Sequence, residues 1–265
     1  EYAYVDSDGT EYSCIYLNED ENRTVKYYKK QPIKWRVLSI DENNNALVIA
    51  DKGLDCRRYD ESGKSVRWTK STLRSWLNGY ANTINEASKD YTSNNFLDIA
   101  FTNAEQNAIQ SRELKTEKNP EENEVGVYFI FDKVFLLSID EIATSSFGFN
   151  SDFNAYSEAR TCSPTVYAVG KGVDRKKVDA WWLRSPGSSE KRASFITTAG
   201  SVRTDGYYGS KDWNFMIRPA MLIKLNSSYV TKAQSVSAYV GKKKGHKHIY
   251  ISHVTKEATC TSMGI

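Results

Sequence analysis

No apolar run in this sequence is long. The longest, Val125 to Phe131, has seven residues, whereas a membrane-spanning helix needs about 20. Apolar residues instead come in short stretches separated by turn-forming residues, which is typical of a globular domain with many short strands. Because 40% of the residues are hydrophobic and 26% are charged, the chain is also neither disordered nor a coiled coil.

The order of the expected elements indicates the fold class. Helix signals lie in the middle of the chain, at Thr69–Gly79, at Asn103–Ser111 and in a short stretch that begins at Asp140. Strands are expected at Tyr12–Leu17, Ile33–Ile40, Ala46–Ala50, Lys133–Ser138, Trp181–Arg184, Ala193–Thr197, Ser201–Arg203 and Phe215–Leu225. Surface loops are expected at Lys115–Glu124 and Phe147–Asp179, the second above the terminal strands. Because strands dominate both ends of the chain, this order favours an α+β fold with antiparallel sheets over a doubly wound parallel one.

Two of the expected helices have clear end signals. Thr69 is the expected N-cap of the first helix, and Gly79 is its expected C-cap. Thr102 and Glu105 have the spacing of a capping box at the start of the second helix.

Residues 1–231 are expected to form a single domain, followed by a basic linker at 232–245 and the start of a further repeat at 246–265. The formal charge of +3 is uneven, because the segment from Lys232 onward holds six lysines against one acid and leaves −2 for the rest. A nucleic-acid interface needs basic residues clustered on a folded surface. We therefore expect no nucleic-acid partner and no membrane insertion.

Histidine occurs at three positions, 246, 248 and 253, so residues 1–245 contain none. That excludes a Ser-His-Asp or Cys-His catalytic unit and a histidine-rich zinc site within the domain. No phosphate-binding Gly-rich loop is present, and Asp6-Ser-Asp-Gly9 lacks the spacing of a calcium loop, so we expect a surface turn there. The sequence predicts no cofactor and no metal for the domain.

The four cysteines, Cys14, Cys56, Cys162 and Cys260, are widely spaced and form no CxxC pair. Two outcomes stay open here, one disulfide of an exported protein or buried thiols. In the tail, Cys260 and the three histidines are of the types that bind zinc, but no second cysteine pair completes a site. We expect this tail to be an exposed fragment of a repeat.

Aromatic residues carry the strongest functional signal. Trp35 alternates with apolar residues in a strand and Trp76 lies on the apolar side of a helix, so both are expected in the core. Trp181 and Trp182 are neighbours on a strand and point to opposite faces, so one of them should face a loop layer or solvent. Flat aromatic faces beside hydrogen-bonding side chains serve sugar and peptide recognition. The candidate ligand-binding residues are Trp182, Tyr207, Tyr208, Lys211, Asp212 and Trp213.

The competing interpretation is that these aromatics only pack loops onto the sheet. Arg184 and Arg218 each follow an apolar strand residue, so we expect both to be buried and structural. Because an unpaired buried guanidinium is costly, each is expected to have a carboxylate partner.

Several motifs recur, in the same order, in a known family. They are PIKWRVL at 32–38, LDC at 54–56, WTKSTLRSWLN at 68–78, DKVFLLS at 132–138, WWLRSPG at 181–187, GSV at 200–202 and IRPAM at 217–221. Through them the chain resembles a bacterial domain family of unknown function that is common in gut Firmicutes. The resemblance implies a C-type-lectin-like fold, with short antiparallel sheets, a few helices and long loops.

The closing segment of the domain is also similar to that of formylglycine-generating (sulfatase-modifying) enzymes and of ligand-binding variable proteins of phage and bacterial surfaces. The tail from His248 resembles the opening of a Cys-rich repeat in secreted, multidomain cell-surface proteins. Formylglycine-generating enzymes need a close cysteine pair, whereas Cys56 and Cys162 are each alone in their segment. Animal C-type lectins bind sugar through calcium, with motifs that Asp212-Trp213-Asn214 does not reproduce.

The leading hypothesis is a non-catalytic, secreted or cell-surface recognition module of a larger bacterial protein, with a glycan or a surface protein as its partner. One alternative is a structural spacer without a ligand, which burial of Tyr208 and Trp213 would favour. Another is an enzyme, either a glycosidase that uses two acids or a distant formylglycine-type oxidase. A carboxylate pair of raised pKa in a cleft, or copper bound to two cysteines, would favour the enzyme.

Overall fold

The computed structural model describes residues 2–19, 22–64, 67–117, 127–172, 180–209, 215–225, 250–252 and 261–262. Most of the described chain lies in short strands joined by turns and loops, with a few helices of one or two turns. The fold is therefore mixed α+β and rich in sheet, as the order of the sequence signals predicts.

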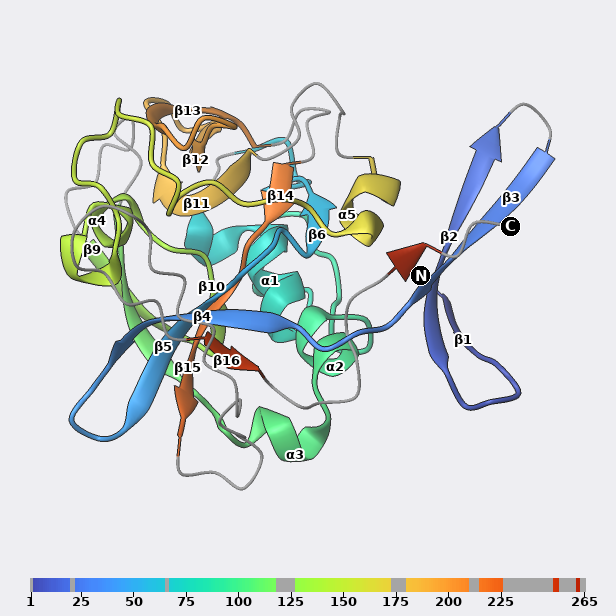
Figure 1. Ribbon diagram of the computed structural model, residues 1–265. Coiled ribbons are helices and arrows are strands. Elements are labelled where there is room, and N and C mark those ends of the chain that lie inside the picture. Colours follow the sequence, from blue (N-terminus) through green and yellow to red (C-terminus); the bar gives the residue numbers. More distant parts are fainter. Residues whose placement is uncertain are drawn as a thin grey trace.

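The strands of the described residues form four sheets (Figure 1). The N-terminal sheet has the order β1 (Tyr2–Val5), β2 (Glu11–Glu19), β3 (Asn22–Lys29) and β17 (Thr261–Ser262). The central sheet has the order β10 (Val134–Phe135), β15 (Ala220–Lys224), β5 (Asn45–Ala50), β4 (Lys34–Ile40) and β16 (Tyr250–Ser252), and β7 (Ile109–Gln110) also pairs with β15. The third sheet has the order β13 (Val202–Tyr208), β12 (Arg192–Ile196), β11 (Trp181–Pro186), β14 (Phe215–Ile217) and β6 (Asp55–Arg57). The fourth sheet is a two-stranded ribbon of β8 (Arg112–Glu117) and β9 (Val127–Asp132).

Five α-helices and two 3₁₀ turns occur in the described part of the chain. The α-helices are α1 (Thr72–Asn78), α2 (Phe96–Ala100), α3 (Asn103–Gln106), α4 (Ile139–Ile142) and α5 (Val166–Gly170). The 3₁₀ turns are η1 (Trp68–Lys70) and η2 (Ser145–Phe147).

The N-terminal sheet projects from the rest of the molecule as a long ribbon (Figure 1). Its contact with the body includes Tyr28, whose ring meets the ring of Tyr167 on α5 edge to face at 5.5 Å between centroids. At its first turn the carboxylate of Asp6 accepts from the backbone N–H groups of Asp8 and Thr10, at 3.0 and 2.8 Å. The surface turn expected at this acidic segment is confirmed.

The sequence predicted the two strands of the β4–β5 hairpin and the helix α1 close to where the structure has them. The hairpin turns at Asn44, which adopts a left-handed φ of 62°, and Gly79 ends α1 with a φ of 70°. The N-cap of α1 is Ser71 rather than Thr69, because residues 68–70 form the separate turn η1 and the Ser71 side chain accepts from the backbone N–H of Arg74.

Three expected elements differ in the structure. The helix after Thr102 keeps its capping box but ends at Gln106, because the chain then extends and Ile109 pairs with Ile223 of β15. Residues 115–117 are not loop but part of β8, where they pair with β9. The strand expected at Phe215–Leu225 is two strands, separated at Arg218-Pro219; β14 pairs in parallel with β11, whereas β15 pairs antiparallel with β5.

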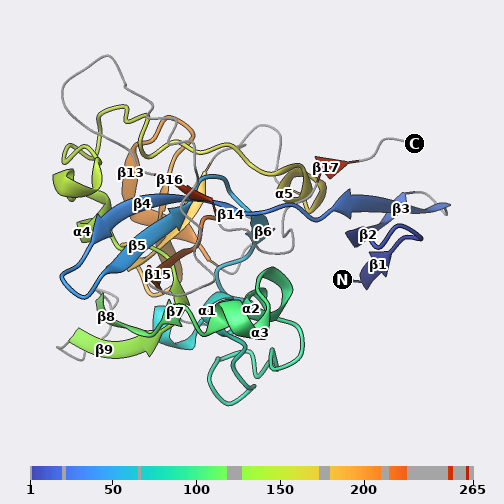
Figure 2. The same cartoon turned by 60° about the horizontal axis from the view of Figure 1, so that its bottom comes forward.

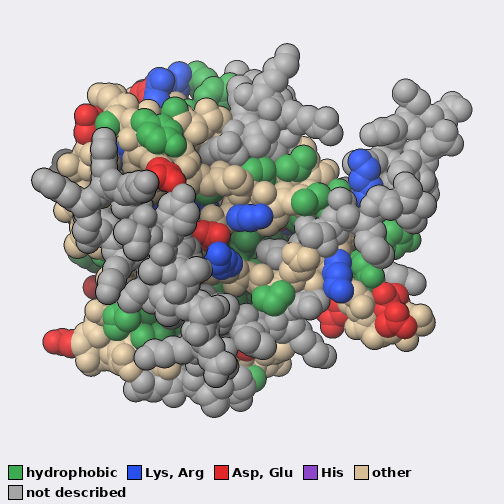
Figure 3. Space-filling view, viewed as in Figure 1, with side chains coloured by type: hydrophobic (Ala, Val, Ile, Leu, Met, Phe, Trp, Pro, Cys, Tyr) green, Lys and Arg blue, Asp and Glu red, His purple; other side chains and the backbone are tan. Residues whose placement is uncertain are grey.

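One hydrophobic core holds the central and third sheets together with α1 and α2. No helix in the described ranges is long and apolar enough to cross a membrane. On the face shown in Figure 3, acidic and basic side chains of the described residues are interspersed rather than gathered by sign. The expected domain boundaries at 231 and 245 fall outside the described residues, so they stay predictions.

Candidate functional site

The aromatic residues singled out in the last third of the sequence form a packed series of rings. Trp182 meets Tyr59 at 5.6 Å and Phe215 at 4.4 Å, and Phe215 meets Tyr207 at 5.7 Å. Trp182 is 0% exposed, and its indole N–H donates to the carbonyl of Arg57 at 3.0 Å. Its expected role in ligand contact is therefore wrong for this structure, since no part of the ring reaches the surface.

The outer end of this series lies at the other predicted residues. Tyr207 and Tyr208 are half-buried at the end of β13, and the guanidinium of Arg192 lies 4.9 Å from the centre of the Tyr208 ring. Lys211, Asp212 and Trp213 lie outside the described residues. A binding face around Tyr208 and Trp213 thus stays a prediction.

Trp181 points to the opposite face of β11, as strand alternation requires. Its indole N–H donates to the carbonyl of Arg160 at 2.9 Å, and its ring lies 5.1 Å from the guanidinium of Arg218. Trp181 is also 0% exposed, so both faces of β11 are covered, one by aromatic rings and one by a loop.

The four residues expected to be structural are all buried. Trp35 and Trp76 lie in the core. Arg184 forms an ion pair with Glu141, which confirms its predicted carboxylate partner. Arg218 differs, because its Nε donates to the carbonyl of Ala50 at 2.8 Å and the described residues supply no carboxylate to it. A backbone carbonyl and the Trp181 ring take the place of the predicted acid.

Glu141, whose side chain is 12% exposed, is one of two arginine-paired carboxylates that bear on the enzyme alternative. It closes a capping box with Ser138 at the start of α4 and forms ion pairs with Arg184 and with Arg112, the latter at 2.8 Å. Burial alone would raise the pKa of Glu141, but the two guanidiniums outweigh burial and hold its pKa below the usual value. A carboxylate held ionised in this way is not a general acid.

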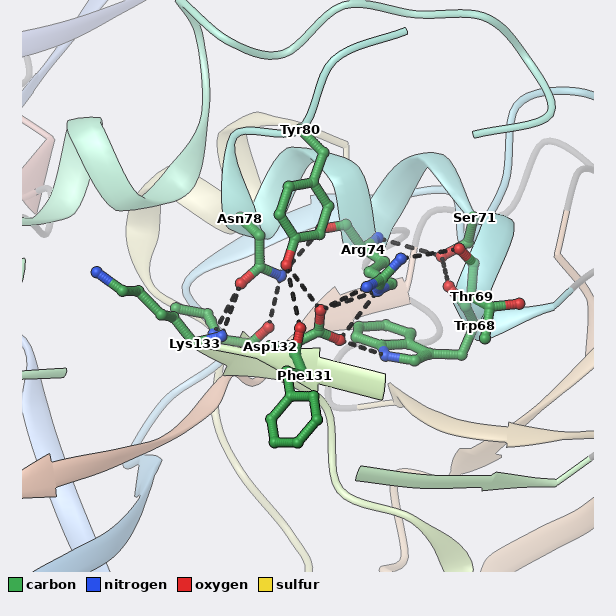
Figure 4. Close-up of polar contacts among 10 residues, drawn as sticks. Trp68, Thr69, Ser71, Arg74, Asn78, Tyr80, Phe131, Asp132 and Lys133 are labelled. Atoms are coloured by element: carbon green, nitrogen blue, oxygen red, sulfur yellow. Dashed lines mark hydrogen bonds and ion pairs between the residues drawn. The ribbon is translucent and has the colours of Figure 1, made fainter. Parts of the chain in front are cut away.

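Asp132, at the end of β9, is the second of these carboxylates and is buried (Figure 4). It accepts from the Trp68 indole N–H at 3.0 Å, from the Arg74 guanidinium at 2.8 and 2.9 Å and from the Tyr80 hydroxyl at 2.9 Å. Asn78 completes the network, because its amide bonds the backbone of Lys133 and Val134. These contacts fasten β9 and β10 to α1, so this carboxylate serves the fold.

The cysteines in the described core are thiols. Cys56 and Cys162 are both buried, and burial, the largest cause, raises the pKa of the Cys56 thiol far above its usual value. A thiol that stays protonated is a poor nucleophile and a poor metal ligand. Of the two outcomes left open by sequence, the structure has buried thiols at these two positions.

One irregular segment is fixed by a single buried cation. We call residues 147–160 the clamped loop. Arg160, at its end, is 0% exposed and donates to four backbone carbonyls, those of Gly200 and Asn150 at 2.6 Å and those of Asp152 and Ala155 at 2.8 Å. The loop therefore wraps around the guanidinium.

A second arginine holds the two ends of the clamped loop to the central sheet. Arg36 on β4 donates to the carbonyl of Ala159 at 2.9 Å and to that of Phe147 at 2.7 Å, and its guanidinium lies 4.9 Å from the Phe149 ring centre. Together the two arginines make the loop a rigid part of the scaffold.

The clamped loop presents polar side chains and one aromatic ring to solvent. Tyr156 is 68% exposed, and Asn150, Asp152, Asn154 and Glu158 are exposed at alternate positions before and after it. The side chains of Asn150 and Asp152 each accept from the backbone N–H two residues on, both at 2.9 Å, which further orders the loop. Sequence reasoning placed this loop above the terminal strands but missed Tyr156; the available signal was the Asn/Asp residues at every second position.

Comparison with known proteins identifies one family. A family model described as "Domain of unknown function (DUF6273)" matches residues 43–225. No curated protein and no solved structure matches the chain.

Proposed function

We propose that this chain, which belongs to the DUF6273 family of domains of unknown function, is a non-catalytic recognition module that binds glycans through the clamped loop. In line with the motifs that resemble C-type-lectin-like proteins, we place it in a larger secreted or cell-surface bacterial protein. The proposal commits to a glycan, and a protein ligand is an outcome of the test below.

The observation that carries the proposal is the exposed ring of Tyr156 among the polar side chains of a fixed loop. An aromatic face packs against the C–H face of a sugar ring, and nearby amides and carboxylates bond its hydroxyls. Asn154 suits this role, because its carboxamide is exposed and makes no hydrogen bond with the described residues. Asp152 adds an acceptor, since its second carboxylate oxygen has no partner within the described ranges.

Rigidity adds to the affinity that such a small surface can reach. Ordering a flexible loop on binding costs free energy, and a loop already held in one conformation avoids that cost. Arg36 and Arg160 hold the backbone of the clamped loop from both sides. The domain thus has the arrangement of a recognition site, a loop on a rigid scaffold.

The enzyme alternative has less support. The carboxylates of Asp132 and Glu141 are each paired with arginine, and the pKa of Glu141 is lowered rather than raised. The spacer alternative draws on the burial of Trp182, but it leaves the exposure of Tyr156 without a role.

A glycan and mucin array probed with the wild-type chain tests the proposal. The matched variants are Tyr156→Ala, in the clamped loop, and Tyr208→Ala, on the face predicted from sequence. Glycan binding that Tyr156→Ala loses and Tyr208→Ala keeps is the expected result. Loss in Tyr208→Ala alone would move the site to the end of β13. A blank array with folded protein would contradict glycan binding and leave a protein ligand or a spacer.

A further inference from the structure

The β8–β9 ribbon exposes two phenylalanines side by side. Phe129 is 62% exposed and Phe131 is 58% exposed, and the two side chains share one face because they are two residues apart on β9. Large apolar side chains grouped on a surface mark an interaction site more often than single ones do. We propose that this face is the contact between two copies of the chain, related by a two-fold axis.

The position of the ribbon suits a contact with another molecule. β10 and β7 lie end to end along one edge of β15, and the chain leaves that edge to form β9 and β8. Figure 2 shows the ribbon at the margin of the molecule. Within the described chain the ribbon pairs with no third strand.

The ribbon is nonetheless held firmly at its base. Asp132, the last residue of β9, is fixed by Arg74, Trp68 and Tyr80, and Figure 4 shows Phe131 pointing away from this network. Arg112, opposite Asp132 at the start of β8, is paired with Glu141. These contacts at the base of the ribbon therefore hold the two phenylalanines in a fixed position.

The charges beside the phenylalanines identify a second copy as the occupant. On the same face β8 carries Glu113, Lys115 and Glu117, all exposed. In the register of the ribbon Glu113 lies opposite Phe131, and Lys115 lies opposite Phe129. Neither Glu113 nor Lys115 has an ion-pair partner within the described ranges.

This arrangement is complementary to itself. Two such faces can be packed together with a two-fold axis that runs across the strands, midway between the 113/131 and 115/129 pairs. Each Phe131 then meets Phe129 of the other copy, and each Glu113 meets Lys115 of the other copy. The contact is isologous, as in most dimers, and buries four aromatic rings beside two ion pairs. Glu117 falls opposite Ser111 and takes no part.

The area is small, so the dimer is weak and depends on concentration. Two rings and two charged residues from each copy cover well under the ~800 Å² per partner of a standard interface. Such contacts dissociate on dilution, and the sedimentation coefficient reports the fraction of dimer directly.

Sedimentation velocity of the full chain over a range of concentrations tests the proposal. We expect the weight-average sedimentation coefficient of the wild type to rise with concentration, and we expect Phe131→Asp to stay monomeric at every concentration. Circular dichroism is the check that the variant is folded, and Phe131→Ala is the milder second variant. A wild type that stays monomeric throughout, or a folded Phe131→Asp that still dimerises, would overturn the proposal.

Charge reversal tests the register. Glu113→Lys and Lys115→Glu each place like charges together twice in the dimer, so each alone should weaken dimerisation about tenfold. An equimolar mixture of the two variants restores both pairs in a mixed dimer and should recover the wild-type affinity. Glu117→Lys is the matched control and should dimerise like the wild type. If the mixture fails to recover, the two-fold register is wrong. Glycan binding through the clamped loop uses other residues, so its outcome does not affect this test.

Discussion

Buried arginine side chains organise the irregular parts of this domain. Arg160, Arg36 and Arg218 all donate to backbone carbonyls, and Arg184 donates to the carbonyl of Leu136 and is also paired with a carboxylate. Burying a cation is costly unless its N–H groups are bonded, and burial accordingly lowers the pKa of Arg160. Each such arginine is therefore tied to one arrangement of the chain around it.

Replacement of Arg160 tests this at a single position. Arg160→Met keeps most of the side-chain volume but leaves four buried carbonyls without their donor, so we expect a loss of about 3 kcal/mol in the free energy of unfolding. Urea denaturation measures this change in the free energy of unfolding. Arg203→Met, at an exposed ion pair with Asp205, is the control and should change stability by less than about 0.5 kcal/mol. Equal stability of Arg160→Met and the wild type would contradict the role of Arg160 in fixing the clamped loop.

Glu141 makes stability depend on pH in a defined direction. Its pKa lies below the usual value of 4.5 in the folded chain, so the ionised carboxylate stabilises the fold above that pH. The contribution is lost as the pH falls through the folded pKa. Glu141→Gln should cost about 3 kcal/mol near neutral pH, and the difference from the wild type should shrink as the pH falls below about 4. Thermal unfolding measured over a pH series checks this, and a difference that stays constant would contradict it.

At the scale of elements, the turn between β12 and β13 is locked to the clamped loop. Gly200 has a φ of 74°, and a Cβ atom placed there would lie 2.5 Å from the carbonyl oxygen of Ser157. A side chain at this position is disfavoured both by the backbone conformation and by the neighbouring loop.

Gly200→Ala should therefore destabilise the domain by about 2 kcal/mol or more. Gly63→Ala is the matched control, because Gly63 has a similar φ of 71° but open space around its Cβ position. Gly63→Ala should lower the free energy of unfolding by about 1 kcal/mol, because only the disfavoured backbone conformation contributes there. Chemical denaturation of both variants separates the two contributions, and equal losses would show that the loop does not press on the turn.

Much of the element order could be predicted because its signals are local. Thr102 and Gly79 lie at helix ends where sequence places caps, whereas the N-cap at Ser138 was not predicted. The β4–β5 hairpin follows from its turn. The ribbon was missed because a charged segment beside a proline resembles a loop, whereas Leu114 and Thr116 face inward and make it a strand. Whether such a segment forms a strand depends on its pairing with a distant segment, which no local sequence pattern indicates.

The site was harder to predict than the fold. Trp182 was expected to reach a ligand, but the rings of Tyr59, of Phe195 on β12 and of Phe215 on β14 cover it, which depends on the assembly of separate segments. The exposure of Tyr156 depends on Arg160 reaching back to carbonyls ten residues earlier. The partner of Arg184 was predictable from the cost of a buried charge. The same reasoning failed at Arg218, where one backbone carbonyl and the Trp181 ring stand in place of a carboxylate.

At the scale of the whole molecule, the order of the clamped loop comes from side chains of the chain itself. The carbonyl oxygens that converge inside the clamped loop are occupied by the Arg160 guanidinium, so we expect the order of the loop not to depend on a divalent cation. The midpoint of thermal unfolding should be the same in EDTA and in excess calcium. A rise of several degrees in calcium would contradict this.

The most direct measurement is the affinity of the strongest array glycan for the wild type, Tyr156→Phe and Tyr156→Ala, by titration calorimetry in EDTA. If the exposed ring binds the sugar, Tyr156→Phe keeps most of the affinity, because it keeps the aromatic face, and Tyr156→Ala loses about tenfold or more. If Tyr156→Ala binds as tightly as the wild type, the clamped loop is not the recognition site.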